Sequence, residues 1–265
     1  MKLFFNKTGS GPTLVILHGL FGSSDNWATL GRKFAENFTV YLVDLRNHGR
    51  SPHNASNSFL DMVQDLHELI IDENLNNINL IGHSMGGKVA MRFAMQYPEK
   101  VNTLISVDAA PVNYPATLHN YHLRYIEALE LIDLSLCHSR GEAERLLTKA
   151  ILSDRMVHFF AKNIYWKEKD LLDWRFNLSS LKKYINEIFE GFDLLSDGIK
   201  PANVKSLFIK GELSDYIIDD YSKTIYNLFP QATIAIIPGA SHWVHADKPE
   251  LFYDAVMSFL LNSKC

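Results

Sequence analysis

Cysteine is scarce in the sequence, and neither sign of charge dominates it. The chain has 265 residues with 2 cysteines, Cys137 and Cys265, which lie far apart and outside any Cys-x-x-Cys or Cys/His cluster. This scarcity argues against a disulfide framework and a zinc site, and it fits a reducing compartment. The formal net charge is −4, without a basic stripe. We therefore expect a small molecule as partner and no nucleic acid.

Long apolar runs are also missing. No run of about 18 apolar residues is present to span a bilayer, and residues 1–8 lack the features of a secretion signal. We expect a cytoplasmic protein with no membrane span. Hydrophobic residues nevertheless make up 47% of the chain, which suits one domain with an insertion. The oligomeric state stays open at this point.

Short apolar runs alternate with amphipathic helical patterns through most of the chain. Alternation of this kind predicts an α/β fold with a mostly parallel sheet flanked by helices. The predicted strands are residues 3–5, 14–17, 40–43, 78–81, 104–107, 207–209 and 233–237.

Strand signals disappear between about residues 111 and 201, where helical patterns replace them. Ser139 and Glu142 have the spacing of a capping box. We predict an α/β core of residues 1–111 and 200–265 and an all-helical cap, or lid, of residues 112–199. The cap supplies Tyr165 and Trp166 to an apolar substrate pocket. We place Phe21 and Trp243 of the core in the same pocket.

The pentapeptide Gly82-His83-Ser84-Met85-Gly86 stands between a predicted strand and a predicted helix. Its glycines permit a sharp, strained turn that leaves the serine hydroxyl exposed at the tip. We therefore predict Ser84 as a nucleophile.

A serine nucleophile needs a base, and histidine has an ordinary pKa near neutrality. In a parallel sheet the reactive groups gather beyond the carboxyl ends of the strands. His242 follows the late strand 233–237 across a short loop, and we favour it over His245, which lies a helical turn further on. His245 and Asp247 lack a third ligand at a suitable spacing, so we expect no metal. We also expect no cofactor.

Two aspartates compete as the acid that orients the base. Asp108 ends the strand 104–107, which directly follows the helix after Ser84 and whose carboxyl end faces the same site. Asp215 follows the strand 207–209 in the segment Gly211-Glu212-Leu213-Ser214-Asp215. We favour Asp108 and keep Asp215 as the alternative.

An attack on an acyl carbon also needs donors for the developing oxyanion, usually backbone amides. Met85 supplies one at a helix N-terminus, where the dipole favours negative charge. We expect the second donor from the loop of residues 18–22, at Leu20 with Phe21 as the alternative.

The motifs HGLFGS, DLRNHGRS, GHSMGGKVAM, VDAAPVNYP and ASHWVHADKPE together resemble those of the small bacterial esterases of the YbfF type, within the α/β-hydrolase superfamily. The likeness runs from about residue 14 to the C-terminal helix and weakens in the cap. It implies an α/β-hydrolase fold and hydrolysis of acyl esters and acyl-CoA thioesters. It also implies that the acid lies in the DxAPV segment, which supports Asp108, and that Ser214 and Asp215 belong to an altered loop after the cap.

The predicted activity is that of a serine carboxylesterase or thioesterase, acyl-CoA included, which works through an acyl-enzyme and a Ser-His-Asp triad. A carbon–carbon bond hydrolase or a lyase is the first alternative, because the same triad serves those reactions. The second is a non-catalytic ligand receptor that keeps the triad.

Overall fold

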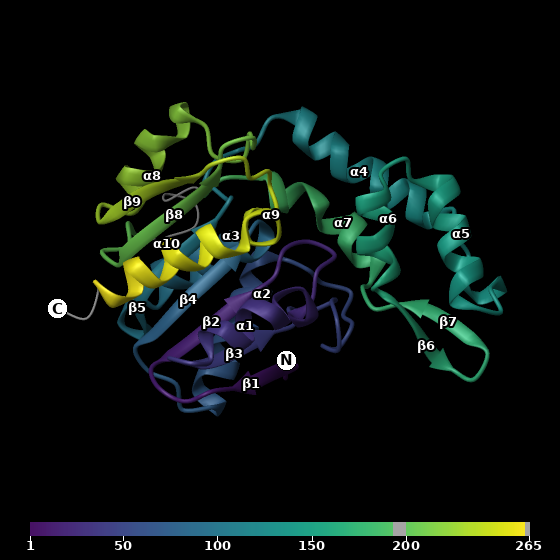
Figure 1. Ribbon diagram of the computed structural model, residues 1–265, viewed down its shortest axis with the longest axis horizontal. Coiled ribbons are helices and arrows are strands. Elements are labelled where there is room, and N and C mark those ends of the chain that lie inside the picture. The colour runs from purple at the N-terminus through teal and green to yellow at the C-terminus, as the bar shows by residue number, and fades with distance from the viewer. Residues whose placement is uncertain (193–199, 263–265) are drawn as a thin grey trace.

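A seven-stranded sheet forms the centre of the molecule in a computed structural model that describes residues 1–192 and 200–262 (Figure 1). Residues 193–199 of the predicted cap and Cys265 lie outside this range. The strand order is β1-β3-β2-β4-β5-β8-β9, with β1 antiparallel to β3 and all other neighbours parallel. The predicted mostly parallel sheet is confirmed. The strands are β1 (Phe5–Thr8), β2 (Thr13–Leu17), β3 (Thr39–Val43), β4 (Ile78–His83), β5 (Val101–Val107), β8 (Lys205–Gly211) and β9 (Ala232–Ile237).

Helices cover both faces of the sheet, and each face has its own apolar core. One core joins the sheet to α1 (Ala28–Phe34) and α10 (Pro249–Leu261). The other joins it to α2 (Phe59–Asp72), α3 (Met85–Gln96) and α8 (Ser222–Leu228). Strands buried on both faces are near-continuous apolar runs, as parallel strands require. None of the helices within residues 1–192 and 200–262 combines the length and apolarity needed to cross a membrane.

The chain between β5 and β8 forms a separate group of elements beside the sheet (Figure 1). We propose that this group is the cap. It contains α4 (Ala116–Glu130), α5 (Arg140–Ala150), α6 (Asp154–Ala161) and α7 (Leu178–Phe189). The expectation of an all-helical cap is wrong, because β6 (Ile164–Glu168) and β7 (Leu171–Trp174) pair as an antiparallel hairpin. Strands of 5 and 4 residues are too short to stand out from neighbouring helical patterns.

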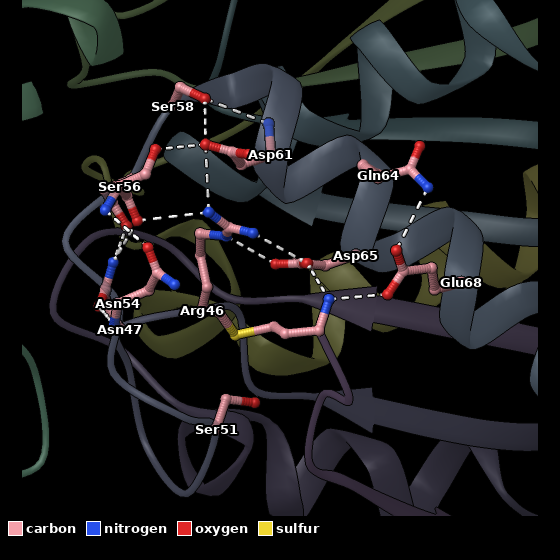
Figure 2. Close-up of polar contacts among 12 residues, drawn as sticks. Arg46, Asn47, Ser51, Asn54, Ser56, Ser58, Asp61, Gln64, Asp65 and Glu68 are labelled. Carbon is pink, nitrogen blue, oxygen red and sulfur yellow. Dashed lines mark hydrogen bonds and ion pairs between the residues drawn. The ribbon is translucent and has the colours of Figure 1, made fainter.

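A polar network holds the loop that follows β3 against α2 (Figure 2). Arg46 donates through Nε and a terminal nitrogen to the two oxygens of Asp65, at 2.6 and 2.9 Å. The amino group of Met1 donates to the same carboxylate at 2.5 Å. Asn47, which follows Arg46 in the chain, contacts the proposed cap, since its carbonyl accepts from the Asn177 amide at 2.9 Å. The network therefore links the N-terminus, α2 and the start of α7.

Candidate active site

Ser84 occupies a strained turn between β4 and α3. Its backbone has φ 53° and ψ −118°, and its amide donates to the carbonyl of Val107 at 3.0 Å. A Cβ at position 82 would come within 2.1 Å of the Gly86 carbonyl, and one at position 86 within 2.4 Å of the His18 carbonyl. Glycine is thus required at both places by close backbone approach. Strain of this kind in a non-glycine residue is typical of functional sites.

Three side chains from separate strand ends meet above this turn. His242 follows β9, and its Nε2 lies 3.0 Å from Ser84 Oγ. Its Nδ1 lies 2.7 Å from Oδ2 of Asp108, the residue that directly follows β5. A carboxylate only accepts hydrogen bonds, so Nδ1 carries the proton and Nε2 is left to accept from the serine hydroxyl. This is the geometry that base-assisted serine attack needs.

Asp108 is fully buried at a second strained position, with φ 49°. Besides contacting His242, it accepts from the Gly211 amide at 3.1 Å and from the Ser214 hydroxyl. Burial raises the pKa of Asp108 to about 6, against the opposing effect of these two donors. Burial also lowers the pKa of His242. Asp215, the alternative acid, is exposed and lines a cavity that His242 also lines but Ser84 does not.

The loop expected to supply an oxyanion donor lies against Ser84. A Cβ at Gly19 would be 3.2 Å from Ser84 Cβ, and the Gly22 amide closes a turn onto the Gly19 carbonyl at 2.9 Å. Leu20 and Phe21 are the central residues of this turn. His18 supports it from below, because Nδ1 donates to the Gly19 carbonyl at 2.8 Å while Nε2 accepts from the Leu45 amide. Met85 begins α3, where the first amides have no acceptor within the helix.

Two further histidines pack beside the three strand-end residues. His83 donates through Nε2 to the His242 carbonyl at 2.9 Å, and burial lowers its pKa. His245 stacks on Trp27, with ring centroids 4.1 Å apart. Asp247 forms an ion pair with Arg155 of α6 at 2.7 Å. His245 therefore has an aromatic partner of its own and Asp247 a cationic one.

The aromatic pocket prediction is only partly matched by the cavities among the described residues. A wide cavity of about 430 Å³ is lined by Ser84, His242, Phe21 and Trp243. Tyr165 and Trp166 line neither this cavity nor the others found beside His242 and Ser84. They lie on the β6–β7 hairpin, where Tyr165 contacts the Arg175 guanidinium and Trp166 is 45% exposed. The prediction that Tyr165 and Trp166 line the substrate pocket is therefore wrong for the cavities described here.

Several neighbours of His242 carry no recognisable sequence signal. The Tyr216 ring stacks on the imidazole with centroids 3.8 Å apart. His122 of α4 is hydrogen-bonded to the Tyr216 hydroxyl at 2.6 Å. Arg155 lies over the Trp243 ring, 4.2 Å from its centroid. Among the residues around Asp108 and His242, the sequence pointed only to Ser214, because it stands just before the alternative acid Asp215.

Comparison with known proteins agrees with this architecture. A family model described as the alpha/beta hydrolase fold matches residues 12–249. The sn-1-specific diacylglycerol lipase ABHD11 of Danio rerio is 36% identical over 97% of this chain and 80% of its own length. Esterase YbfF of Escherichia coli is 31% identical over 96% of this chain and 95% of its own length. A solved structure of a marine microorganism esterase is 45% identical with a TM-score of 0.94, over 97% of this chain and 99% of that one. The chain belongs to the α/β-hydrolase family and is related to the bacterial esterases of the YbfF type.

Proposed function

We propose that the protein hydrolyses carboxylic esters through an acyl-enzyme formed on Ser84. The observation that carries the proposal is the contact chain from Ser84 Oγ through the His242 ring to Asp108, with distances of 3.0 and 2.7 Å. Relatives named as esterases and as a diacylglycerol lipase support ester hydrolysis as the reaction class.

The reaction has two halves. His242 Nε2 removes the proton of the Ser84 hydroxyl as Oγ attacks the acyl carbon. The same proton passes to the leaving alcohol when the tetrahedral intermediate collapses, and a water then repeats the sequence to release the acid. Asp108 holds the imidazole in the Nδ1–H tautomer and stabilises the imidazolium. The amides of Met85 and Leu20, with Phe21 as the alternative to Leu20, receive the oxyanion, each worth about 3 kcal/mol of barrier.

Rapid mixing with p-nitrophenyl acetate tests the proposal. We expect a burst of nitrophenol equal to the enzyme concentration, and mass spectrometry of quenched samples should find one acetyl group on Ser84. Ser84→Ala should abolish both signals. Asp215→Asn is a matched control, because this exposed side chain lies outside the contact chain.

Two other outcomes would replace the proposal. Turnover of a vinylogous diketone without an ester burst would favour a carbon–carbon bond hydrolase. A thermal shift on ligand addition without any product would favour a non-catalytic receptor.

A thioester with a phosphate-bearing leaving group, such as acyl-CoA, is the second candidate substrate. Arg155, His158 and Lys162 are exposed on or just after α6, share one helical face by their spacing, and line the wide cavity. Acetyl-CoA should then be cleaved with a higher kcat/KM than S-acetyl-N-acetylcysteamine, which has the same thioester but no phosphates. Lys162→Gln should reduce kcat/KM for acetyl-CoA and leave kcat/KM for S-acetyl-N-acetylcysteamine unchanged. Equal values for the two thioesters would remove this candidate.

A further inference from the structure

Ser84 lies where two cavities of very different volume meet. The wide cavity measures about 430 Å³, whereas a narrow cavity beside it measures about 10 Å³. Ser84, Leu20 and His122 line both of them. His242 lines the wide cavity and not the narrow one, whereas Met85 lines the narrow cavity and not the wide one.

We propose that the narrow cavity is the acyl pocket and that it limits the enzyme to very short acyl groups, with acetyl preferred. The proposal rests on the proposed function. The leaving group departs from the carbon bound to Ser84 Oγ and must take a proton from His242 Nε2, so it has to occupy the cavity that both residues line, which is the wide one. With the carbonyl oxygen held by the amides of Met85 and Leu20, the acyl substituent is directed to the remaining side of Ser84, which is the narrow cavity.

The volume of the narrow cavity sets the size of the group. About 10 Å³ of open space holds roughly one water-sized group, and the methyl of an acetyl group has that size. Each further methylene has to displace side chains from a packed wall, and overpacking of this kind is costly. The leaving group, in contrast, has a cavity of about 430 Å³.

Polar contacts of Lys88 and apolar packing of α7 hold the wall of the narrow cavity in place. The buried Lys88 ammonium donates to the carbonyl of Val112, which precedes α4, at 3.1 Å, and to that of Glu190, which follows α7. It also lies 4.5 Å from the centroid of the Tyr114 ring. The remaining wall includes Ile188 and Phe189 of α7, both 6% exposed. A longer acyl chain would have to break these contacts to enter.

The first experiment measures kcat/KM for p-nitrophenyl esters from acetate to octanoate, so that only the acyl length varies. We expect the highest value for acetate and a fall of at least tenfold by butyrate. A profile that is flat or rises with chain length would overturn the acyl-pocket assignment. Parallel assays of Ser84→Ala separate the two proposals, because activity that survives this substitution refutes the acyl-enzyme itself.

A second experiment enlarges the pocket. Ile188→Ala removes three carbons from the wall of the narrow cavity, so we expect its preferred ester to shift from acetate to butyrate or hexanoate. Ile185→Ala is the matched control, since Ile185 is a buried isoleucine of the same helix that does not line the narrow cavity. It should keep the wild-type profile. A shift in both variants, or in neither, contradicts the proposal, and Ile188→Val provides a milder change with the same expected direction.

Discussion

The phenol ring of Tyr216 stacks on the imidazole of His242, with ring centroids 3.8 Å apart and planes inclined by 20°. Tyr216 is buried, and its hydroxyl is hydrogen-bonded to His122 of the proposed cap. The orientation of the proposed base thus depends on a ring from the loop after β8, and that ring depends in turn on α4. Neither Tyr216 nor His122 is one of the three side chains that carry the proposed chemistry.

Substitutions at Tyr216 should separate stacking from hydrogen bonding. Tyr216→Phe keeps the ring and removes the hydroxyl, so we expect kcat to fall less than threefold. Tyr216→Leu removes the stacked ring and should lower kcat about tenfold, because a misplaced base loses much of its effect. Steady-state kinetics and the pH profile of kcat check this, with retained thermal stability as the control. Equal losses in both variants would assign the effect to the hydroxyl.

The two candidate acids predict opposite kinetic results. Asp108→Asn should lower kcat by about ten-thousandfold, since an amide no longer selects the productive imidazole tautomer. Asp215→Asn should change kcat less than twofold, because the Asp215 side chain is exposed and the His242 Nδ1 already lies 2.7 Å from Asp108. The reverse ranking in a matched assay would move the acid to Asp215.

The acid limb of the pH–activity profile should reflect the Asp108–His242 pair. The Asp108 carboxylate has to be ionised to accept from Nδ1, and burial raises its pKa to about 6. We therefore expect kcat/KM to fall as the pH drops below about 6, as a property of the coupled pair. A profile that stays level down to pH 4.5, in an enzyme shown to remain folded, would contradict this.

The same raised pKa predicts a pH-dependent stability difference. The folded state holds the Asp108 proton more tightly than the unfolded state, whose ordinary pKa is 3.8. Its favourable contribution to stability is complete below that value and is lost as the pH rises through about 6. Asp108→Asn does not titrate at this position, so it should gain stability relative to the wild type between pH 4.5 and 8. Urea unfolding of both proteins at pH 4.5 and pH 8 measures this change. If the stability difference between Asp108→Asn and the wild type is the same at the two pH values, the prediction is refuted.

The buried pair of Arg46 and Asp65 should matter for stability and not for chemistry. Arg46→Met leaves Asp65, 1% exposed, with the Met1 amino group as its remaining charged partner. We expect the free energy of unfolding to fall by about 3 kcal/mol, because removing one member of a buried pair strands the other charge. Urea unfolding is the measurement. Gln64→Ala, on the exposed side of α2, is the control and should stay within about 0.5 kcal/mol.

Local patterns were sufficient for the sheet and for the serine turn. All seven predicted core strands are present, with β1 displaced toward Phe5–Thr8. Half of the predicted capping box at Ser139 forms, since the Ser139 hydroxyl accepts from the Glu142 amide at 3.2 Å, whereas the Glu142 carboxylate accepts from the His138 amide at 2.7 Å. These features arise from interactions within a few residues or from the burial of continuous apolar runs, so they can be recognised along the chain.

The surroundings of His242 depend on the order of strands and on cap packing. Because β5 lies between β4 and β8, Asp108 comes within reach of His242, while the loop after β8 contributes Ser214 as a donor to that carboxylate. The sequence determined by itself where the strands of the seven-stranded sheet run and where the serine turn is made, since short-range periodicity and glycine sterics carry that information. Only the tertiary structure decided which of Asp108 and Asp215 contacts His242, because this contact joins residues more than a hundred positions apart, and no local pattern encodes such distances.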